Sequence, residues 1–204
     1  MSQVMTAEER EQSVNAAPAE NGKKKLTENT SLAAKILALC IAVSFFVIGP
    51  MKLSGMYKKA EHVFKYGNNA EYTVSVYNDI MTSANSASIL AGLAEAELGK
   101  TDDVKELGKL AKDLVDEDDA DDLIEDFIDL VQISNTVYSA YEKSAGEVSK
   151  DAEKAIRNIN NARTTVSNDS YWTYAADFNA ARKGFPGAIM GLIGGTHKLP
   201  DKLG

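Results

Sequence analysis

The chain has 204 residues, of which 44% are hydrophobic and 25% are charged, and its formal net charge is -8. This composition is typical of a folded protein of about one domain. The excess of 30 acidic residues over 22 basic ones argues against nucleic acid as a partner. One cysteine and two histidines are too few for a multi-thiolate zinc site or a disulfide framework.

Residues 1–30 are predicted to form a disordered polar tail. They contain many Glu, Asn and Ala residues and almost no large apolar side chain. Such a segment cannot bury enough apolar surface to offset the entropy lost on folding.

Residues 31–53 are predicted to form a transmembrane signal anchor. From Ile36 to Met51 the sequence contains no charged residue, and at 1.5 Å per residue this run covers about 24 Å, or about 30 Å when Ser31 to Ala34 are included. That length matches the hydrocarbon core of a bilayer, so lipid is an expected partner of Ile36 to Met51. A buried core helix and a cleaved signal peptide are the alternatives, and the long polar region before the apolar run argues against cleavage.

Lysines flank both ends of the predicted anchor in nearly equal number, so the charge bias for orientation is small. The compact cluster Lys23 to Lys25 lies in the short tail, where positive charge most strongly resists translocation. We therefore expect a single-pass protein of the cell membrane with its amino terminus inside and its helical part extracytoplasmic.

Residues 54–195 are predicted to be all-α, as an antiparallel three- or four-helix bundle with long helices. After Lys52 the only prolines are Pro186 and Pro200, so no proline interrupts a helix over most of this range. The one segment with strand-like alternation, Tyr72 to Tyr77, leads into an Ala-rich run and is predicted as helical.

A coiled-coil-like apolar seam runs through the second half of this range. Gly99 is the expected end of one helix, Thr101 or Asp102 the expected amino cap of the next, and a break is expected near residues 167–170. Around Gly146 the seam steps by four residues twice, which predicts either local unwinding or a break between antiparallel helices. The seam positions are Leu123, Phe127, Leu130, Ser134, Val137, Tyr141, Ala145, Val148, Ala152, Ala155, Ile159, Ala162 and Val166.

No sequence motif predicts catalysis, a cofactor or a metal. The acidic run Asp116 to Asp122 lacks the glycine that an EF-hand calcium loop requires at its sixth position, and we interpret it as a helix amino terminus and its solvated connection. Neither His62 nor His197 has a partner ligand at helical spacing. We therefore expect a protein that is not an enzyme.

The carboxyl-terminal segment carries the most specific pattern. Tyr171, Phe178 and Phe185 are seven residues apart, and Pro186 fits the first turn of a short apolar helix. The pairs Phe178-Asn179 and Phe185-Pro186, followed by that helix, resemble the end of LemA family proteins, in which Tyr-Asn pairs recur seven residues apart before Phe-Pro. The anchor followed by helices is similar too, whereas Trp172 and Phe178 depart from the family pattern. The resemblance implies a membrane-attached helical protein and supplies no catalytic residue.

These observations predict a membrane-anchored helical structural or interaction protein that binds a protein partner or its own copies. The alternative is an extracytoplasmic helical sensor or ligand-binding domain that signals through a separate partner. The candidate docking surface is Trp172, Tyr174, Phe178, Phe185 and Pro186, for which plain core packing is the competing interpretation. Phe185, Pro186 and Ala188 to Ile193 are expected to form an exposed apolar hook for a partner or the bilayer, and residues 196–204 a flexible tail.

Overall fold

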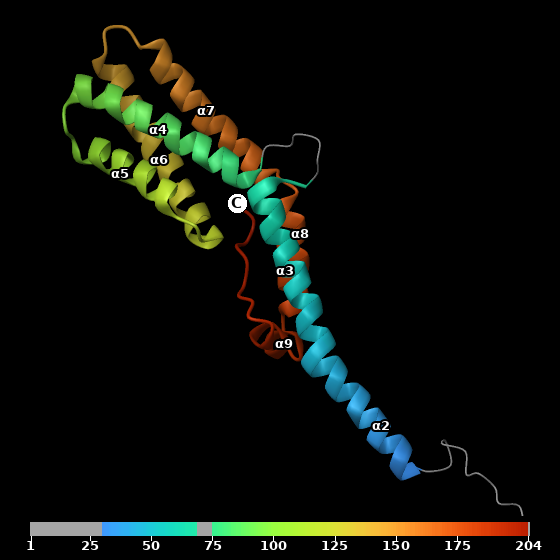
Figure 1. The fold of residues 1–204 in the computed structure, drawn as a ribbon. Coiled ribbons are helices and arrows are strands. Elements are labelled where there is room, and N and C mark those ends of the chain that lie inside the picture. Colours follow the sequence, from blue (N-terminus) through green and yellow to red (C-terminus); the bar gives the residue numbers. More distant parts are fainter. Residues whose placement is uncertain (1–29, 69–74, 204) are drawn as a thin grey trace, which may run out of the picture. The chain divides into compact units, whose positions relative to one another are not determined.

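The computed structural model describes residues 30–68 and 75–203 (Figure 1), so the predicted disordered tail lies almost wholly outside the described residues, as do Tyr72 to Val74 of the strand-like patch. Within the described ranges all regular secondary structure is helical, which confirms the all-α prediction. The chain divides into two compact units, Met1–Ala42 and Val43–Gly204.

The first unit contains most of helix α2 (Thr30–Val43), which has no buried residue. The helical stretch Thr30–Tyr66 is long and apolar enough to cross a membrane, with a window of mean hydropathy 2.4 that is entirely unburied. The predicted membrane-spanning helix is therefore present, at the level of length and composition.

The second unit begins with a π-helical turn, η2 (Ser44–Ile48), followed by α3 (Gly49–Tyr66). The amide of Gly49 donates to the carbonyl of Ser44, and the next residue, Pro50, has no amide hydrogen to donate to an α-helical turn. The wider turn thus comes directly before the proline. Beyond it, α3 buries a stripe formed by Leu53, Ala60, Val63 and Phe64.

Four helices follow and pack on one another (Figure 1). They are α4 (Val76–Leu98), α5 (Asp102–Asp116), α6 (Ala120–Ser144) and α7 (Lys150–Ser167). Helix α4 contacts each of the other three, and α6 contacts both α5 and α7. The central position of α4 explains its nine buried residues, most of them Ala or Ser, whose small size lets three neighbours approach closely.

Local sequence signals set the limits of these helices. The side chains of Ser75, Thr101, Asp119 and Ser149 each accept a hydrogen bond from an amide in the first helical turn, which satisfies donors that have no partner within the helix. Gly99, at φ +75°, ends α4, because that backbone region costs glycine little. The predictions for Gly99 and Thr101 are confirmed.

The predicted seam forms the buried side of α6 and α7. Its residues from Leu123 to Tyr141 on α6 are all buried, as are those from Ala152 to Val166 on α7. Ala145 and Val148 lie in the connection between the helices, so the irregular spacing near Gly146 marks a break. The break near residues 167–170 is also present, because α7 ends at Ser167 and the next helix starts at Tyr171.

The chain ends with α8 (Tyr171–Arg182), α9 (Gly187–Ile193) and an irregular segment over residues 194–203. Both helices contact α3, and in Figure 1 α8 lies along α3 with α9 beyond its end. The carboxyl-terminal residues therefore pack against the helix that follows the apolar run in the sequence.

Candidate functional site

Aromatic side chains from α3 and α8 form the core where these two helices meet. The rings of Phe64 and Tyr171 are 5.2 Å apart and those of Tyr57 and Phe178 are 5.5 Å apart, both in edge-to-face geometry, an arrangement that aromatic pairs favour. The indole nitrogen of Trp172 donates a hydrogen bond to the backbone carbonyl of Val166. The first turn of α8 is thereby fixed to both α3 and α7.

The five residues predicted as a docking surface lie in three different environments. Trp172 and Phe178 are buried and belong to the core. Tyr174 is half-buried; its hydroxyl donates to Asn68 at 2.7 Å, and the Lys59 amino group lies 4.7 Å from its ring centroid. Phe185 and Pro186 are exposed.

The predicted aromatic stripe is interrupted at its last member. Helix α8 ends at Arg182, and Lys183 is already in an extended conformation. Tyr171 and Phe178 therefore share a buried face of α8, whereas Phe185 lies beyond the helix with 81% of its surface exposed. Equal sequence spacing gives a common face only while the helix continues.

Phe185 and α9 present an apolar surface, which we call the α9 patch. It consists of Phe185, Ile189, Leu192 and Ile193, whose exposed fractions range from 41% to 81%. Helix α9 also contacts α3 through Met190: a Cβ atom built at Gly49 would lie 2.8 Å from the terminal methyl of Met190, so the side chain of Met190 rests on bare helix backbone. This short helix therefore has apolar side chains both in the contact with α3 and in the exposed α9 patch.

The segment after α9, for which the sequence predicts a flexible tail over residues 196–204, makes specific contacts over residues 196–203, and we call this segment the docked tail. The Asn179 side chain pairs with the backbone of Leu199, donating to its carbonyl at 2.8 Å and accepting from its amide at 3.0 Å. Leu199 is buried, and the His197 ring lies 2.9 Å from the Tyr57 hydroxyl. The sequence signal for this docking is weak: Leu199 and Leu203 stand among charged residues, and the two hydrogen bonds of Leu199 are made by its backbone, which any residue carries.

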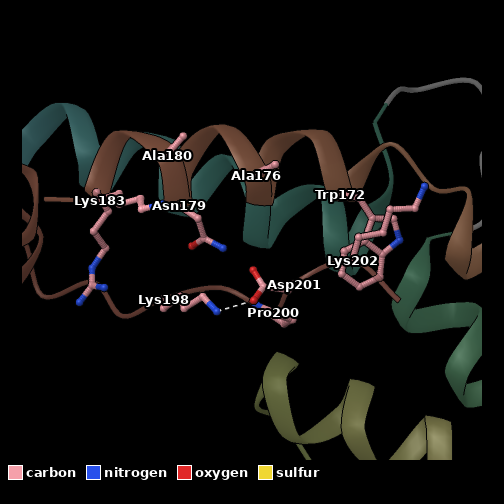
Figure 2. Close-up of a pocket in the computed structure, with 10 residues that line it drawn as sticks. Trp172, Ala176, Asn179, Ala180, Lys183, Lys198, Pro200, Asp201 and Lys202 are labelled. Carbon is pink, nitrogen blue, oxygen red and sulfur yellow. Dashed lines mark hydrogen bonds and ion pairs between the residues drawn. The ribbon is translucent and has the colours of Figure 1, made fainter. Parts of the chain in front are cut away.

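A groove of about 600 Å³ lies between α8 and the docked tail (Figure 2). Its lining includes four basic residues, Arg182, Lys183, Lys198 and Lys202, and one acidic residue, Asp201, which is paired with Lys198. Figure 2 shows Asn179 on the α8 side and the Lys198–Asp201 pair on the tail side. The excess of positive charge would favour an anionic ligand over a cation.

Two titratable groups, one half-buried on α4 and one buried on α8, have raised pKa values. Burial, with a smaller contribution from the nearby carboxylate of Asp169, raises the pKa of Asp79 from 3.8 to about 6. Burial, followed by the charge of Asp121, raises the pKa of the Tyr171 hydroxyl. One Asp79 carboxyl oxygen and the Tyr171 hydroxyl are buried without a hydrogen-bond partner. The unpaired Tyr171 hydroxyl and the ionised form of Asp79 therefore each lower the stability of the fold.

Within residues 30–68 and 75–203, no group of three or more His, Cys, Asp or Glu side chains is arranged to hold a metal ion. His62 contacts the ring of Tyr66, and His197 contacts Tyr57. No protein-family model, curated protein or solved structure matches the chain.

Proposed function

We propose that this chain is a membrane-anchored helical structural or interaction protein, similar to the LemA family, that crosses the bilayer once through Ile36 to Met51. The observation that carries the proposal is the contrast along Thr30–Tyr66: its apolar window is entirely unburied, whereas the later turns bury Leu53, Ala60 and Phe64. An apolar window that the protein leaves unburied is suited to lipid.

The finer architecture in this proposal is an antiparallel bundle of α4 to α7. The connections between these helices are short, from Gly99 to Thr101, Glu117 to Asp119 and Ala145 to Ser149, and short connections favour antiparallel neighbours. The likeness to the LemA family rests on Phe178-Asn179 and Phe185-Pro186. In this chain Phe178 fills the α3–α8 core and Asn179 holds the tail, so the first pair has a structural role.

The proposed orientation places the amino terminus inside and the helical domain outside the cytoplasm. Its support is the cluster Lys23 to Lys25, together with the acidic composition of the helices. A protein partner or a second copy would then meet the domain on the outer side.

Protease digestion of intact cells tests both the anchor and the orientation. The full chain carries one tag before Met1 and another after Gly204, and the membrane fraction is washed with alkaline carbonate. We expect both tags to stay with the membrane at full-length mass, and protease to remove only the carboxyl-terminal tag. Release by carbonate would contradict the anchor, and loss of only the amino-terminal tag would contradict the orientation.

A matched pair of charge substitutions separates anchoring from general misfolding. Ile41→Arg places a charge in the apolar run, which costs about 2.5–3.5 kcal/mol at the centre of a membrane helix, and should shift the protein towards the soluble fraction. Ile89→Arg, at a similarly exposed position on α4 (54% against 59%), should remain in the membrane. Equal distributions would remove the support for the apolar run as the anchor.

The groove beside α8 favours the second candidate function, an extracytoplasmic sensor or ligand-binding domain. Its basic lining and volume suit a small anion. Inorganic phosphate should then raise the unfolding temperature of the full chain in detergent, and Lys183→Gln with Lys202→Gln should abolish the shift. Chloride at matched ionic strength is the control, and equal shifts with both salts would argue against a ligand site.

A further inference from the structure

The α9 patch lies in an uncharged segment bounded by basic residues. From Gly184 to Thr196 the sequence has no charged side chain, whereas Arg182 and Lys183 precede it and Lys198 follows it closely. A short apolar helix flanked by positive charge is typical of segments that lie in the interface of a bilayer. Large apolar residues also lie exposed on α4, α5 and α6, at Ile89, Val115 and Ile128 respectively, but each of these helices carries only one.

The contacts of this segment with the apolar run indicate which partner the α9 patch binds. The Phe185 ring is 5.9 Å from the ring of Phe45 in η2, within the apolar run predicted to cross the membrane. A Cβ atom built at Gly194 would lie 3.0 Å from the Pro50 carbonyl oxygen, so the two backbones approach closely. The α9 patch is therefore continuous with the carboxyl-terminal end of the apolar run.

A groove of about 510 Å³ between α3 and α9 extends the same surface. Phe46, Val47, Met51 and Ile193 line its apolar part, and Lys58 lines it as well. Apolar walls with one ammonium group match a lipid, whose acyl chain and anionic headgroup need those two environments.

We propose that Phe185 and α9 insert into the bilayer as a second membrane contact, in the leaflet that holds the end of the transmembrane helix. The inference rests on the proposed anchor, because the lipid surface is placed by the apolar run. The patch would lie about 5–10 Å into the boundary between headgroups and acyl chains, with Arg182, Lys183 and Lys198 near the headgroups. Two contacts, one spanning and one interfacial, would limit the tilt of the domain relative to the membrane.

Spin-label accessibility in vesicles tests the insertion. The full chain with Cys40→Ala receives a nitroxide label at Leu192→Cys on α9, and it is reconstituted into phosphatidylcholine vesicles containing phosphatidylglycerol. A label at Val115→Cys on α5 is the matched control, because Val115 is also an exposed apolar residue (53%). A third sample carries the label on the native Cys40, within the apolar run. Collisions with oxygen, which partitions into lipid, are compared with collisions with a water-soluble nickel chelate.

We expect oxygen collisions to exceed nickel-chelate collisions at Leu192 and at Cys40, and the ratio to be reversed at Val115. If Cys40 is in lipid while Leu192 matches Val115, the second contact is wrong and the anchor stands. If Cys40 itself is accessible to the chelate, the anchor and the inference both fail. A Leu192 label shielded from both reagents and broadened by a second label would assign the α9 patch to contact between copies, which also overturns the proposal.

Discussion

The four helices α4 to α7 and the carboxyl-terminal elements α8 and α9 differ in the side chains that hold them together. The first group packs mainly Ala, Leu, Ile and Val across helix faces, with Phe127 and Tyr141 as its buried aromatic residues, and leaves a charged surface. The second group packs with α3 through the aromatic residues Tyr57, Phe64, Tyr171 and Phe178, and it leaves apolar side chains exposed on α9. The comparison indicates that exposed apolar surface is concentrated where the chain also carries its candidate membrane span.

The largest expected loss of stability comes from Phe127→Ala, and Phe185→Ala is its matched control in the other region. Phe127→Ala on α6 removes a fully buried ring and should lower the free energy of unfolding by about 3–5 kcal/mol. Phe185→Ala removes a ring that is 81% exposed and should cost less than about 1 kcal/mol. Urea unfolding of both variants in detergent measures the difference, and comparable losses would show that Phe185 belongs to a core.

Loss of the Asn179 side chain should release the docked tail while leaving α4 to α7 intact. Asn179→Ala leaves the buried amide and carbonyl of Leu199 without their partner, at a cost of about 1–3 kcal/mol. Hydrogen exchange followed by mass spectrometry should show faster exchange over residues 196–203 and unchanged exchange in α5. Unchanged exchange in the tail would mean that Leu199 is held by its apolar contacts alone.

Two glycine substitutions sharpen the comparison, because one glycine lies under a neighbouring backbone and the other lies in open space. A Cβ atom at Gly187 would lie 3.1 Å from the backbone carbonyl carbon of Arg182, whereas one at Gly92 on α4 meets nothing within 4 Å. Gly187→Ala should therefore loosen the joint between α8 and α9, and Gly92→Ala should stabilise α4 by about 0.5–1 kcal/mol. Thermal unfolding measures both, and stabilisation by Gly187→Ala would contradict the close packing.

An effect of similar size is expected from the titration of Asp79, as a dependence of stability on pH. Its pKa is about 6 in the folded protein against 3.8 for the unperturbed group, so the folded state binds the proton more tightly than the unfolded state. Stability from this group is then full below about pH 4 and is lost as the pH rises to about 6.

Asp79→Asn should remove that pH dependence and raise the free energy of unfolding at pH 7, because the neutral amide avoids the cost of a partly desolvated charge. The gain should be only about 1 kcal/mol, since solvent screens the exposed part of the carboxyl group. Urea midpoints at pH 4 and pH 7 test this prediction. Asp79→Asn and the parent protein are measured side by side. If both lose the same stability between pH 4 and pH 7, Asp79 is not the source of the pH dependence.

Much of the helical part could be predicted from the sequence, because the deciding signals are local. Thr101 provides a side-chain oxygen for the first turn of α5, and Gly99 accepts a backbone conformation that ends α4. The seam from Leu123 to Tyr141 follows from helical periodicity, which places those residues on one face. Docking of the tail could not be predicted in this way, since the Asn179 side chain binds backbone atoms twenty residues away.

The features of the candidate site are likewise of two kinds, those that the sequence determines and those that depend on tertiary packing. The sequence by itself determined the apolar run from Ile36 to Met51, the uncharged segment from Gly184 to Thr196 and the aromatic residues at seven-residue spacing, because these are properties of composition and order. Only the tertiary structure decided that Trp172 and Phe178 are buried and that Phe185 is exposed beside Phe45. The physical reason is that α8 ends at Arg182, so the helical periodicity that places Tyr171 and Phe178 on one buried face does not extend to Phe185.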